Sequence, residues 1–367
     1  MGGARRLWVV SRVFPPDEGG VQTYARAVAD GYAALGWRVT VFTKSSAGPA
    51  RTETGGVAVI DVGPGAMAVV YGRLFRAMKR HRREDGLPDV IHACTWRAAL
   101  PALPLGGRLI VAVHGREIGR PKGVAFRLMR AVLRRAARVV AVSGTTRTLL
   151  FRRLPELEAR CVVAWNGATE PSGSVERPSA PIERPIELLT VCRLVERKNV
   201  RAAIDAVAGV RDIELRYRIA GRGPEEGGVR ATIERHGIGD QVDALGFVED
   251  GTLDRLYREA DIFLHPQIAL EEGGEIEGFG ISVADAMAYG LPCIVGRDGG
   301  PAELIEEGVT GLIVDGRSSA AIGKAVELLV RSPELRAAMG GCARDWARAN
   351  LSWERHCRLA LAGIANG

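Results

Sequence analysis

The chain has 367 residues, of which 47% are hydrophobic and 25% are charged. These proportions are ordinary for a soluble globular protein and exclude a fibrous or disordered chain. At roughly 100–200 residues per domain, the length predicts two domains rather than one.

Charge is distributed unevenly along the chain. Residues 1–180 contain 28 Lys and Arg against 13 Asp and Glu, whereas residues 181–367 contain 22 against 30. A basic first half suits a membrane surface, nucleic acid or an anionic substrate, although solvated helix faces give the same pattern. No aromatic interleaving marks the Arg runs as a base-stacking surface, so we expect no nucleic acid partner.

Signals for export, membrane insertion and structural metal are missing from the sequence. No apolar run reaches the roughly 18 residues of a membrane span, and the N-terminus lacks the apolar region of a signal peptide. The six cysteines never form C-x-x-C, and the six histidines never form H-E-x-x-H. We therefore expect a cytoplasmic protein with neither a disulfide framework nor a zinc cluster.

The first half alternates short apolar runs with helical segments, beginning with a strand, a glycine-rich turn and a helix. This alternation is typical of a doubly wound parallel α/β sheet. Strands are predicted at 7–13, 37–43, 57–62, 89–93, 109–113, 138–142 and 161–164, and helices at about 21–35, 71–83 and 124–137.

A second sheet of the same kind is predicted after a segment rich in Pro and Ser. The predicted domains are 1–172 and 186–343, with a linker at 173–185 and a helical segment at 344–367 that packs back on the first domain. Strands are predicted at 186–192, 215–220, 241–245, 261–264, 292–295 and 311–314, and helices at 199–208, 228–236, 253–259, 281–289, 302–307 and 333–362.

Loops after parallel strands are the first place to look for a ligand site. Gly19 and Gly20 precede a helix N-terminus, an arrangement that suits an approaching phosphate and also a tight turn. Arg193 and Lys198 follow a strand, where two cations could hold a diphosphate or form a surface charge run.

Two further loops resemble nucleotide-binding motifs to different degrees. Residues 221–227 have three residues, not two, before the third Gly of a dinucleotide fingerprint, so we interpret them as a strand-to-helix turn and disfavour a nicotinamide oxidoreductase. Glu277 precedes a helix that contains Asp285, so one acid can face a sugar and the other its nucleotide. The helix dipole alone also favours acids such as Glu277 and Glu303.

Taken together and in their order along the chain, these motifs resemble those of the GT-B retaining glycosyltransferases of family 4. The resemblance implies two Rossmann-like domains that face each other across a cleft. Asp285 stands where the family usually has Glu, one methylene longer. The matching residues are Gly19-Gly20, Arg193 with Lys198, Glu277-x-Phe-Gly with Asp285, and Gly299-Gly300-x-x-Glu303; lesser matches are residues 113–115, 140–143, 165–167, 260–266 and 310–315.

The resemblance also implies a donor, a nucleotide-diphosphate sugar with UDP or GDP as the nucleotide, held mainly by the second domain. Arg193 and Lys198 are expected to neutralise the diphosphate, Glu277 to hold sugar hydroxyls and Asp285 to hold ribose hydroxyls. The remaining expected contacts are Phe247 and Val248 at the base, the N–H groups of Phe279, Gly280 and Ile281 at the phosphates or sugar, Glu303 behind that loop, Gly20 at the β-phosphate and His114 at the reacting sugar.

The expected reaction is hexosyl transfer to an acceptor hydroxyl with retention, by same-face attack in which the leaving phosphate takes the acceptor proton. No D-x-D triplet occurs, and we expect neither a metal nor a cofactor. A nucleotide-sugar epimerase or phosphorylase is the alternative enzyme. A non-catalytic binding protein is disfavoured because Glu277, Arg193 and Lys198 are all present. Arg-rich helices at 76–83 and 127–138 suggest peripheral contact with anionic membrane.

Overall fold

The computed structural model describes residues 5–17, 19–175, 184–270 and 275–364. These residues form two units. The first unit combines Met1–Gly167 with Ser352–Gly367, and the second is Ala168–Leu351. The predicted linker, 173–185, therefore belongs to the second unit, and its residues 176–183 lie outside the described residues. The predicted helical segment 344–367 is divided, because only its part from Ser352 onward joins the first unit.

The first unit contains an eight-stranded sheet with the order β3-β4-β2-β1-β5-β6-β7-β8. All neighbours are parallel except β3, which runs antiparallel to β4 at the edge. The strands are β1 (Arg6–Val10), β2 (Arg38–Thr43), β3 (Pro49–Thr54), β4 (Val57–Val62), β5 (Val90–Ala93), β6 (Arg108–Val113), β7 (Arg138–Ala141) and β8 (Cys161–Val163).

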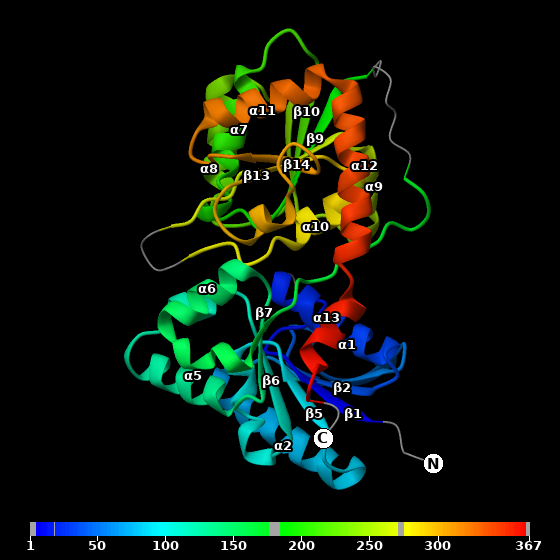
Figure 1. Ribbon diagram of the computed structural model, residues 1–367, viewed down its shortest axis with the longest axis vertical. Coiled ribbons are helices and arrows are strands. Elements are labelled where there is room, and N and C mark those ends of the chain that lie inside the picture. The colour runs from blue at the N-terminus through cyan, green and yellow to red at the C-terminus, as the bar shows by residue number, and fades with distance from the viewer. Residues whose placement is uncertain (1–4, 18, 176–183, 271–274, 365–367) are drawn as a thin grey trace. The chain divides into compact units, whose positions relative to one another are not determined.

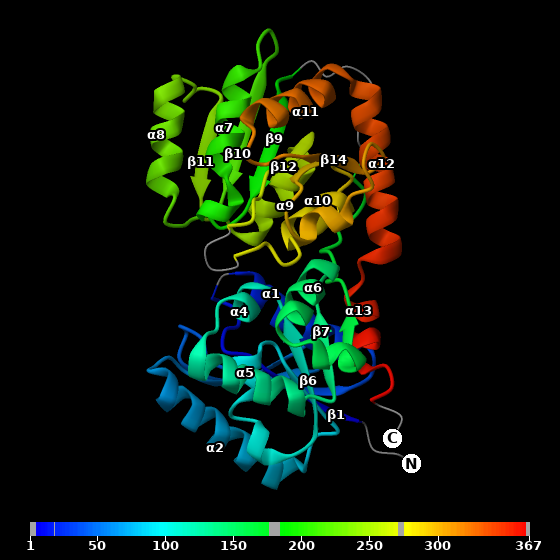
Figure 2. The same cartoon turned by 60° about the vertical axis from the view of Figure 1, so that its left-hand side comes forward.

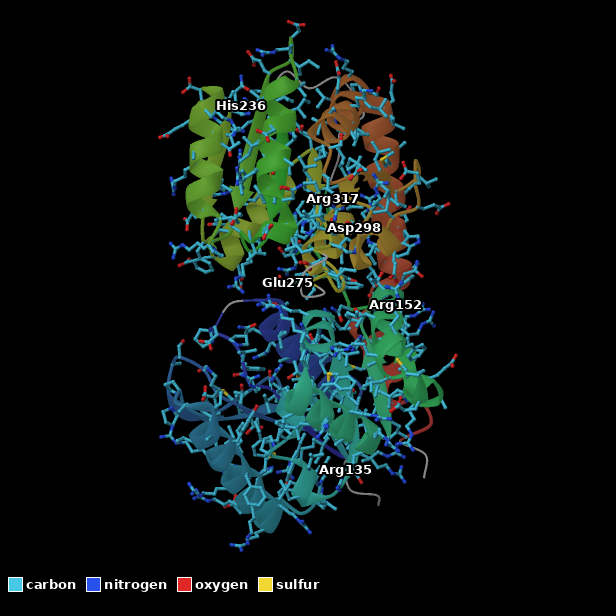
Figure 3. The ribbon with its side chains drawn as sticks, turned by 90° about the vertical axis from the view of Figure 1, so that its left-hand side faces the viewer. Arg135, Arg152, His236, Glu275, Asp298 and Arg317 are labelled. Atoms are coloured by element: carbon cyan, nitrogen blue, oxygen red, sulfur yellow. The ribbon has the colours of Figure 1, made fainter. Side chains whose placement is uncertain are left out.

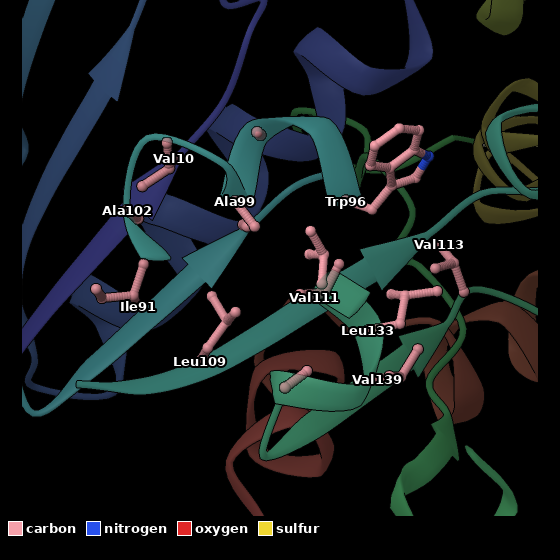
Figure 4. Close-up of a cluster of buried hydrophobic side chains, with 14 of the residues drawn as sticks. Val10, Ile91, Trp96, Ala99, Ala102, Leu109, Val111, Val113, Leu133 and Val139 are labelled. Atoms are coloured by element: carbon pink, nitrogen blue, oxygen red, sulfur yellow. The ribbon is translucent and has the colours of Figure 1, made fainter. Parts of the chain in front are cut away.

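Helices cover both faces of this sheet, because alternate strand residues are apolar on each side. On one face, β-strand residues such as Val10, Val111 and Val139 join one hydrophobic cluster with Leu133 (Figure 4). On the other face lie α1 and α13, side by side in Figure 1. The helices are α1 (Gly20–Ala34), α2 (Met67–Asp85), α3 (Trp96–Ala99), α4 (Arg116–Gly119), α5 (Gly123–Arg135), α6 (Gly144–Arg153) and α13 (Trp353–Leu361).

The C-terminal helix α13 is packed closely into the first unit. The position of a Cβ added at Gly31 would be 2.9 Å from Cys357 Sγ, and one added at Gly167 would be 2.4 Å from the Trp353 backbone N. Ser352 caps the helix by accepting a hydrogen bond from the Arg355 N–H. The continuous helix predicted over 333–362 is therefore wrong. Two helices replace it, Pro333–Asn350 and Trp353–Leu361, and between them the chain passes from the second unit to the first.

The second unit contains a six-stranded, wholly parallel sheet with the order β11-β10-β9-β12-β13-β14. Two doubly wound sheets were predicted, and both are confirmed. The strands are β9 (Ile186–Val191), β10 (Leu215–Ala220), β11 (Val242–Gly246), β12 (Ile262–His265), β13 (Cys293–Gly296) and β14 (Gly311–Val314).

Helices α7, α8 and α11 form one layer on this sheet, and α9 and α10 cover the other face, with α12 against α10 (Figure 2). The helix predicted at 302–307 is a short 3-10 turn, Gly300–Leu304, because Pro301 and the preceding glycines start it tightly. The helices are α7 (Val200–Gly209), α8 (Glu226–His236), α9 (Asp250–Glu259), α10 (Ile281–Ala288), α11 (Ser319–Arg331) and α12 (Pro333–Asn350).

Candidate active site

The loop after β9 carries the two predicted cations. It contains a 3-10 turn, Glu196–Lys198, and Asn199 then adopts a left-handed conformation (φ 50°) at the start of α7. The Asn199 side-chain amide donates a 2.6 Å hydrogen bond to the Gly316 carbonyl. This turn buries Lys198, which is 6% exposed, and leaves the Arg193 side chain exposed.

The fingerprint-like segment 221–227 supports this same loop. A Cβ at Gly221 would lie 1.8 Å from the Cys192 carbonyl oxygen, and one at Gly223 would lie 2.0 Å from the Leu194 carbonyl oxygen. The Leu194 N–H also donates to the Arg222 carbonyl at 2.9 Å. These glycines permit close backbone packing after β10, in agreement with the interpretation of a strand-to-helix turn.

Lys198 meets Glu277 in the second unit. Its Nζ lies 2.8 Å from Glu277 Oε2, and an Arg197 Nη lies 3.1 Å from the same oxygen. Burial alone would raise the pKa of Glu277, but the positive charges of Lys198 and Arg197 lower it to about 2. Glu277 is therefore an anion at neutral pH. Because both cations contact Oε2, Oε1 is the oxygen left to accept a hydrogen bond from a sugar hydroxyl.

His265, at the end of β12, also contacts Lys198. Its Nε2 lies 3.1 Å from Lys198 Nζ, and the imidazole is 1% exposed. Burial, reinforced by the positive charge of Lys198, holds the pKa of His265 well below its usual value. Neither His265 nor Arg197 was predicted as a site residue from the sequence. The signal for His265 was a polar residue at the carboxyl end of an apolar strand, whereas Arg197 was hidden in a charged run.

The backbone around Glu277 is fixed by neighbouring glycines. The Gly300 N–H donates a 2.9 Å hydrogen bond to the Glu277 carbonyl, and a Cβ at Gly300 would lie 2.1 Å from the Gly278 carbonyl oxygen. Close backbone approach therefore explains the Gly299-Gly300 pair. Glu303 follows in the same 3-10 turn and is half-buried.

Asp298 and Arg317 hold the start of the segment that leads from β12 toward Glu277 (Figure 3). Asp298 Oδ2 accepts a 2.8 Å hydrogen bond from the Ala269 N–H and pairs with an Arg317 Nη at 2.6 Å. Burial acts to raise the pKa of Asp298, but the hydrogen bond from Ala269 and the charge of Arg317 outweigh the effect of burial. The pKa of Asp298 is therefore below its ordinary value.

Helix α10 begins at Ile281, four residues after Glu277. Gly280 is its N-cap residue (φ 91°), Phe279 is buried and Ile281 is half-buried. The first N–H groups of a helix have no intrahelical acceptor and carry partial positive charge, which suits a phosphate. Asp285 lies within the helix and is buried, and its Oδ1 accepts a 2.6 Å hydrogen bond from the Thr169 N–H. Burial raises the pKa of Asp285 to about 7, against the opposing effect of Thr169.

The predicted base-binding residues follow β11. Phe247 is 43% exposed and Val248 is half-buried. The Gly221 N–H donates to the Gly246 carbonyl at 2.7 Å, so this loop is tied to the one after β10. An exposed aromatic ring beside two strand ends can stack on a nucleobase.

The remaining predicted residues, Gly20 and His114, belong to the first unit. A Cβ added at Gly20 would meet nothing within 4 Å, so no packing contact demands glycine there. His114 follows β6, and its Nε2 lies 2.9 Å from the Cys94 carbonyl oxygen. Since a carbonyl only accepts, His114 Nε2 carries the proton that it donates to Cys94. The Tyr24 ring packs edge-on against His114, with centroids 4.6 Å apart.

Tyr24 also belongs to a buried hydrogen-bonded chain on the α1 face of the sheet. Its hydroxyl lies 3.0 Å from His92 Nε2 and 2.9 Å from His356 Nε2, and the Tyr32 hydroxyl lies 2.8 Å from His92 Nδ1. His356 Nδ1 is 3.1 Å from the Ala164 carbonyl oxygen, so it donates there and Nε2 accepts from Tyr24. Burial lowers the pKa of His356 to about 4 and that of His92 well below its usual value.

The described ranges contain no group of three or more His, Cys, Asp or Glu side chains arranged to hold a metal ion. Within those same ranges, no helix combines the length and the apolar character needed to cross a membrane.

Comparisons with known proteins agree with this architecture. Residues 174–346 match the family model described as Glycosyl transferases group 1, and residues 18–169 match the one described as Glycosyltransferase Family 4. The chain is 28% identical over 371 residues, covering 95% of both chains, to the GDP-mannose-dependent alpha-(1-6)-phosphatidylinositol monomannoside mannosyltransferase of Mycobacterium tuberculosis (strain ATCC 25618 / H37Rv). It is 27% identical to the D-inositol 3-phosphate glycosyltransferase of Arthrobacter sp. (strain FB24), covering 94% of this chain and 89% of the relative.

Solved structures share the fold across nearly the whole chain. Sucrose-phosphate synthase from Thermosynechococcus elongatus matches with a TM-score of 0.80 at 19% identity, covering 96% of each chain. HepE from Anabaena, in complex with UDP and glucose, matches with a TM-score of 0.75 at 18% identity, covering 96% of this chain and 97% of that one. The paired Rossmann-like sheets and the two domain matches identify the protein as a glycosyltransferase of the GT-B fold with a group 1 glycosyltransferase domain.

Proposed function

We propose that the protein transfers a hexosyl group from a UDP- or GDP-sugar to an acceptor hydroxyl, with retention of configuration. The arrangement of Lys198, Arg197 and Glu277 is the observation that carries this proposal. It sets two cations beside a carboxylate at the carboxyl ends of parallel strands, where nucleotides bind in such sheets. The cations suit a diphosphate, and Glu277 Oε1 suits a hydroxyl of the attached sugar.

The chemistry needs little beyond charge stabilisation. As the bond between the sugar and the diphosphate breaks, negative charge grows on the diphosphate, and Arg193, Lys198 and the N-terminus of α10 stabilise it. The acceptor hydroxyl attacks from the same face, and the leaving phosphate takes its proton. No step in this scheme requires a metal. The second unit binds the donor, with Phe247 and Val248 at the base and Asp285 at the ribose, and the first unit binds the acceptor.

Two relatives suggest which substrates to test first. Their names specify GDP-mannose and phosphatidylinositol monomannoside in one case and inositol 3-phosphate in the other. We therefore propose GDP-mannose as the first donor and an inositol-containing compound as the first acceptor, with UDP-glucose as the second donor.

Helix α5 supports peripheral contact with an anionic membrane. Val124 is 79% exposed and Leu128 is 42% exposed, and they lie four residues apart on one face of the helix. Arg127 and Arg135 beside them are also exposed. Other residues of the helix, Met129, Val132 and Leu133, pack on the sheet. Val124 and Leu128 are therefore not needed to pack the helix on the sheet. They can insert among lipid headgroups while the arginines attract anionic lipid.

The direct test is product formation from GDP-mannose or UDP-glucose with inositol 3-phosphate or phosphatidylinositol monomannoside. We expect transfer that depends on the acceptor, and an α-linked product from the α-linked donor by NMR. Conversion of the donor sugar without an acceptor would indicate the epimerase instead, and sugar 1-phosphate formed with inorganic phosphate would indicate the phosphorylase. A β-linked product would overturn retention.

A further inference from the structure

The buried imidazole of His265 contacts the site but has no place in the transfer scheme above. It comes from the last residue of β12, whereas Lys198 comes from the turn after β9 and Glu277 from the segment before α10. Three separate parts of the second unit thus converge on one ammonium group. Lys198 Nζ lies 2.8 Å from Glu277 Oε2 and 3.1 Å from His265 Nε2.

The proton positions in this contact follow from the chemistry of the two groups. An ammonium group has three N–H donors and no acceptor. His265 Nε2 must therefore accept from Lys198, which places the imidazole proton on Nδ1 and makes the ring neutral. The near-complete burial of His265 agrees with a neutral ring, because a second buried positive charge beside Lys198 would be strongly unfavourable.

Two protein acceptors fix the direction of the third N–H. A lysine side chain has four rotatable bonds, and pairing with Glu277 alone would leave its ammonium free to rotate about that contact. The hydrogen bond to His265 commits one N–H, and the ion pair with Glu277 Oε2 holds the side of the ammonium group that faces the acid, so the direction left for the diphosphate is restricted. Resting on the proposed function, we propose that His265 is a positioning residue that aims Lys198 at the diphosphate of the donor.

The charge of the cluster explains why a histidine suits this position better than an acid. Arg197 and Lys198 contribute two positive charges and Glu277 one negative charge, so a neutral His265 leaves the cluster with a net charge of +1. A carboxylate at position 265 would cancel that charge and would weaken attraction for an anionic diphosphate. The imidazole therefore supplies an acceptor without removing the charge that the donor needs.

Three variants separate positioning from packing. His265→Gln keeps a neutral acceptor at about the reach of Nε2, His265→Asn keeps the same amide on a shorter side chain, and His265→Leu keeps apolar bulk with no acceptor. His236→Gln is the matched control, because His236 lies on α8 and pairs with Asp205 at the surface. Thermal unfolding of each variant checks that the fold is retained.

The measurements are calorimetric binding of GDP, UDP, guanosine and uridine, and kcat and KM with GDP-mannose and UDP-glucose. We expect His265→Leu and His265→Asn to lose at least tenfold in affinity for the nucleoside diphosphate that the wild type binds, with nucleoside affinity unchanged. Their kcat should fall as well, and His265→Gln should recover most of both losses. A packing defect would weaken nucleoside and nucleotide binding alike and would not distinguish Gln from Asn.

Three negative results are distinguishable: two would overturn the positioning role alone, and one would overturn the proposed function. If the wild type and His265→Leu bind the nucleoside diphosphate and turn over equally well, the positioning role is overturned and the proposed function stands. The positioning role is overturned in the same way if His265→Gln is as impaired as His265→Leu. If the wild type binds neither GDP nor UDP and transfers no sugar, the proposed function itself is overturned, and the role of His265 with it.

Discussion

The backbone N–H of Thr169 donates a 2.6 Å hydrogen bond to Oδ1 of Asp285. Thr169 lies two residues beyond the point where the chain leaves the first unit, so the acid expected at the ribose also fastens the first residues of the second unit. One carboxylate oxygen is committed to this contact. The shorter side chain of Asp, compared with the Glu usual in the resembling family, is consistent with a carboxylate held close to the backbone.

Replacing Asp285 by Asn should change how stability depends on pH. Burial raises the pKa of Asp285 to about 7 in the folded protein, from 3.8 as its ordinary value. The folded state thus binds the proton more tightly, and the wild type loses stability as pH rises from about 4 to about 7, by about 4 kcal/mol. Asp285→Asn keeps an acceptor for Thr169 and does not titrate. The unfolding free energy of Asp285→Asn should therefore rise relative to that of the wild type as pH increases across this range. Urea unfolding at several pH values measures both free energies. A difference between them that does not change with pH would contradict the prediction.

Loss of either predicted cation should impair transfer without unfolding the protein. Arg193→Ala and Lys198→Ala each remove a charge-assisted contact of about 1.5–3 kcal/mol to the developing negative charge, or about 10- to 150-fold in kcat/KM. Arg201→Ala, an exposed arginine on α7, is the control and should behave like the wild type. Wild-type turnover in both site variants would show that the diphosphate binds elsewhere.

Turnover should be insensitive to metal removal, because arginine, lysine and helix N–H groups supply the positive charge in the proposed scheme. The rate in excess EDTA should equal the rate with added Mg²⁺ or Mn²⁺. Dialysis against chelator before the assay removes tightly held ions. A rate that falls with chelator and returns with metal would overturn this part of the mechanism.

The exposed face of α5 should bind anionic vesicles in a salt-dependent manner. Each basic residue near such a surface contributes about 1 kcal/mol, which salt screens. Co-sedimentation with phosphatidylserine vesicles should be strong at low salt and weak at high salt, and Leu128→Ser should reduce it. Leu328→Ser is a matched control, because Leu328 is 47% exposed on α11 of the second unit. If no protein sediments at low salt, the arginines are merely solvated, and a small soluble acceptor is favoured.

The buried histidine of α13 should make the first unit sensitive to acid. The pKa of His356 is about 4 in the folded protein against 6.5 ordinarily, so the unfolded chain gains the proton first as pH falls. The wild type should lose about 3 kcal/mol relative to His356→Gln between pH 6.5 and pH 4. His236→Gln, at an exposed histidine, should follow the wild type. A constant difference between the wild type and His356→Gln would show that the pKa of His356 is the same in the folded and the unfolded state, and would contradict the prediction.

The sequence predicted most strands of both sheets, because each carries apolar residues at consecutive or alternating positions. The ranges of β4, β10 and β14 agree residue for residue with the prediction. Strand β3 was missed because all six of its residues are exposed and polar side chains dominate it, although Gly55-Gly56 between β3 and β4 is a hairpin signal. Tertiary pairing with β4, rather than an apolar pattern, forms this edge strand.

Part of the candidate site was also predictable from the order of strands and helices. Arg193, Lys198 and Glu277 follow strands or precede a helix, so their place in the order of elements pointed to them. That Lys198 pairs with Glu277 could not be read from the chain, because 78 intervening residues separate the two. Arg197 and His265 enter the site only through that three-dimensional convergence.

The division of the first unit between Met1–Gly167 and Ser352–Gly367 also imposes an order on synthesis. A ribosome completes the entire second unit before it makes Trp353, His356 and Cys357, which the first unit buries or packs against α1. Until then Tyr24 lacks one of the two histidines that its hydroxyl contacts, and the face of the sheet that α13 covers stays open to solvent. The unit whose synthesis begins first is therefore the unit that completes its folding last.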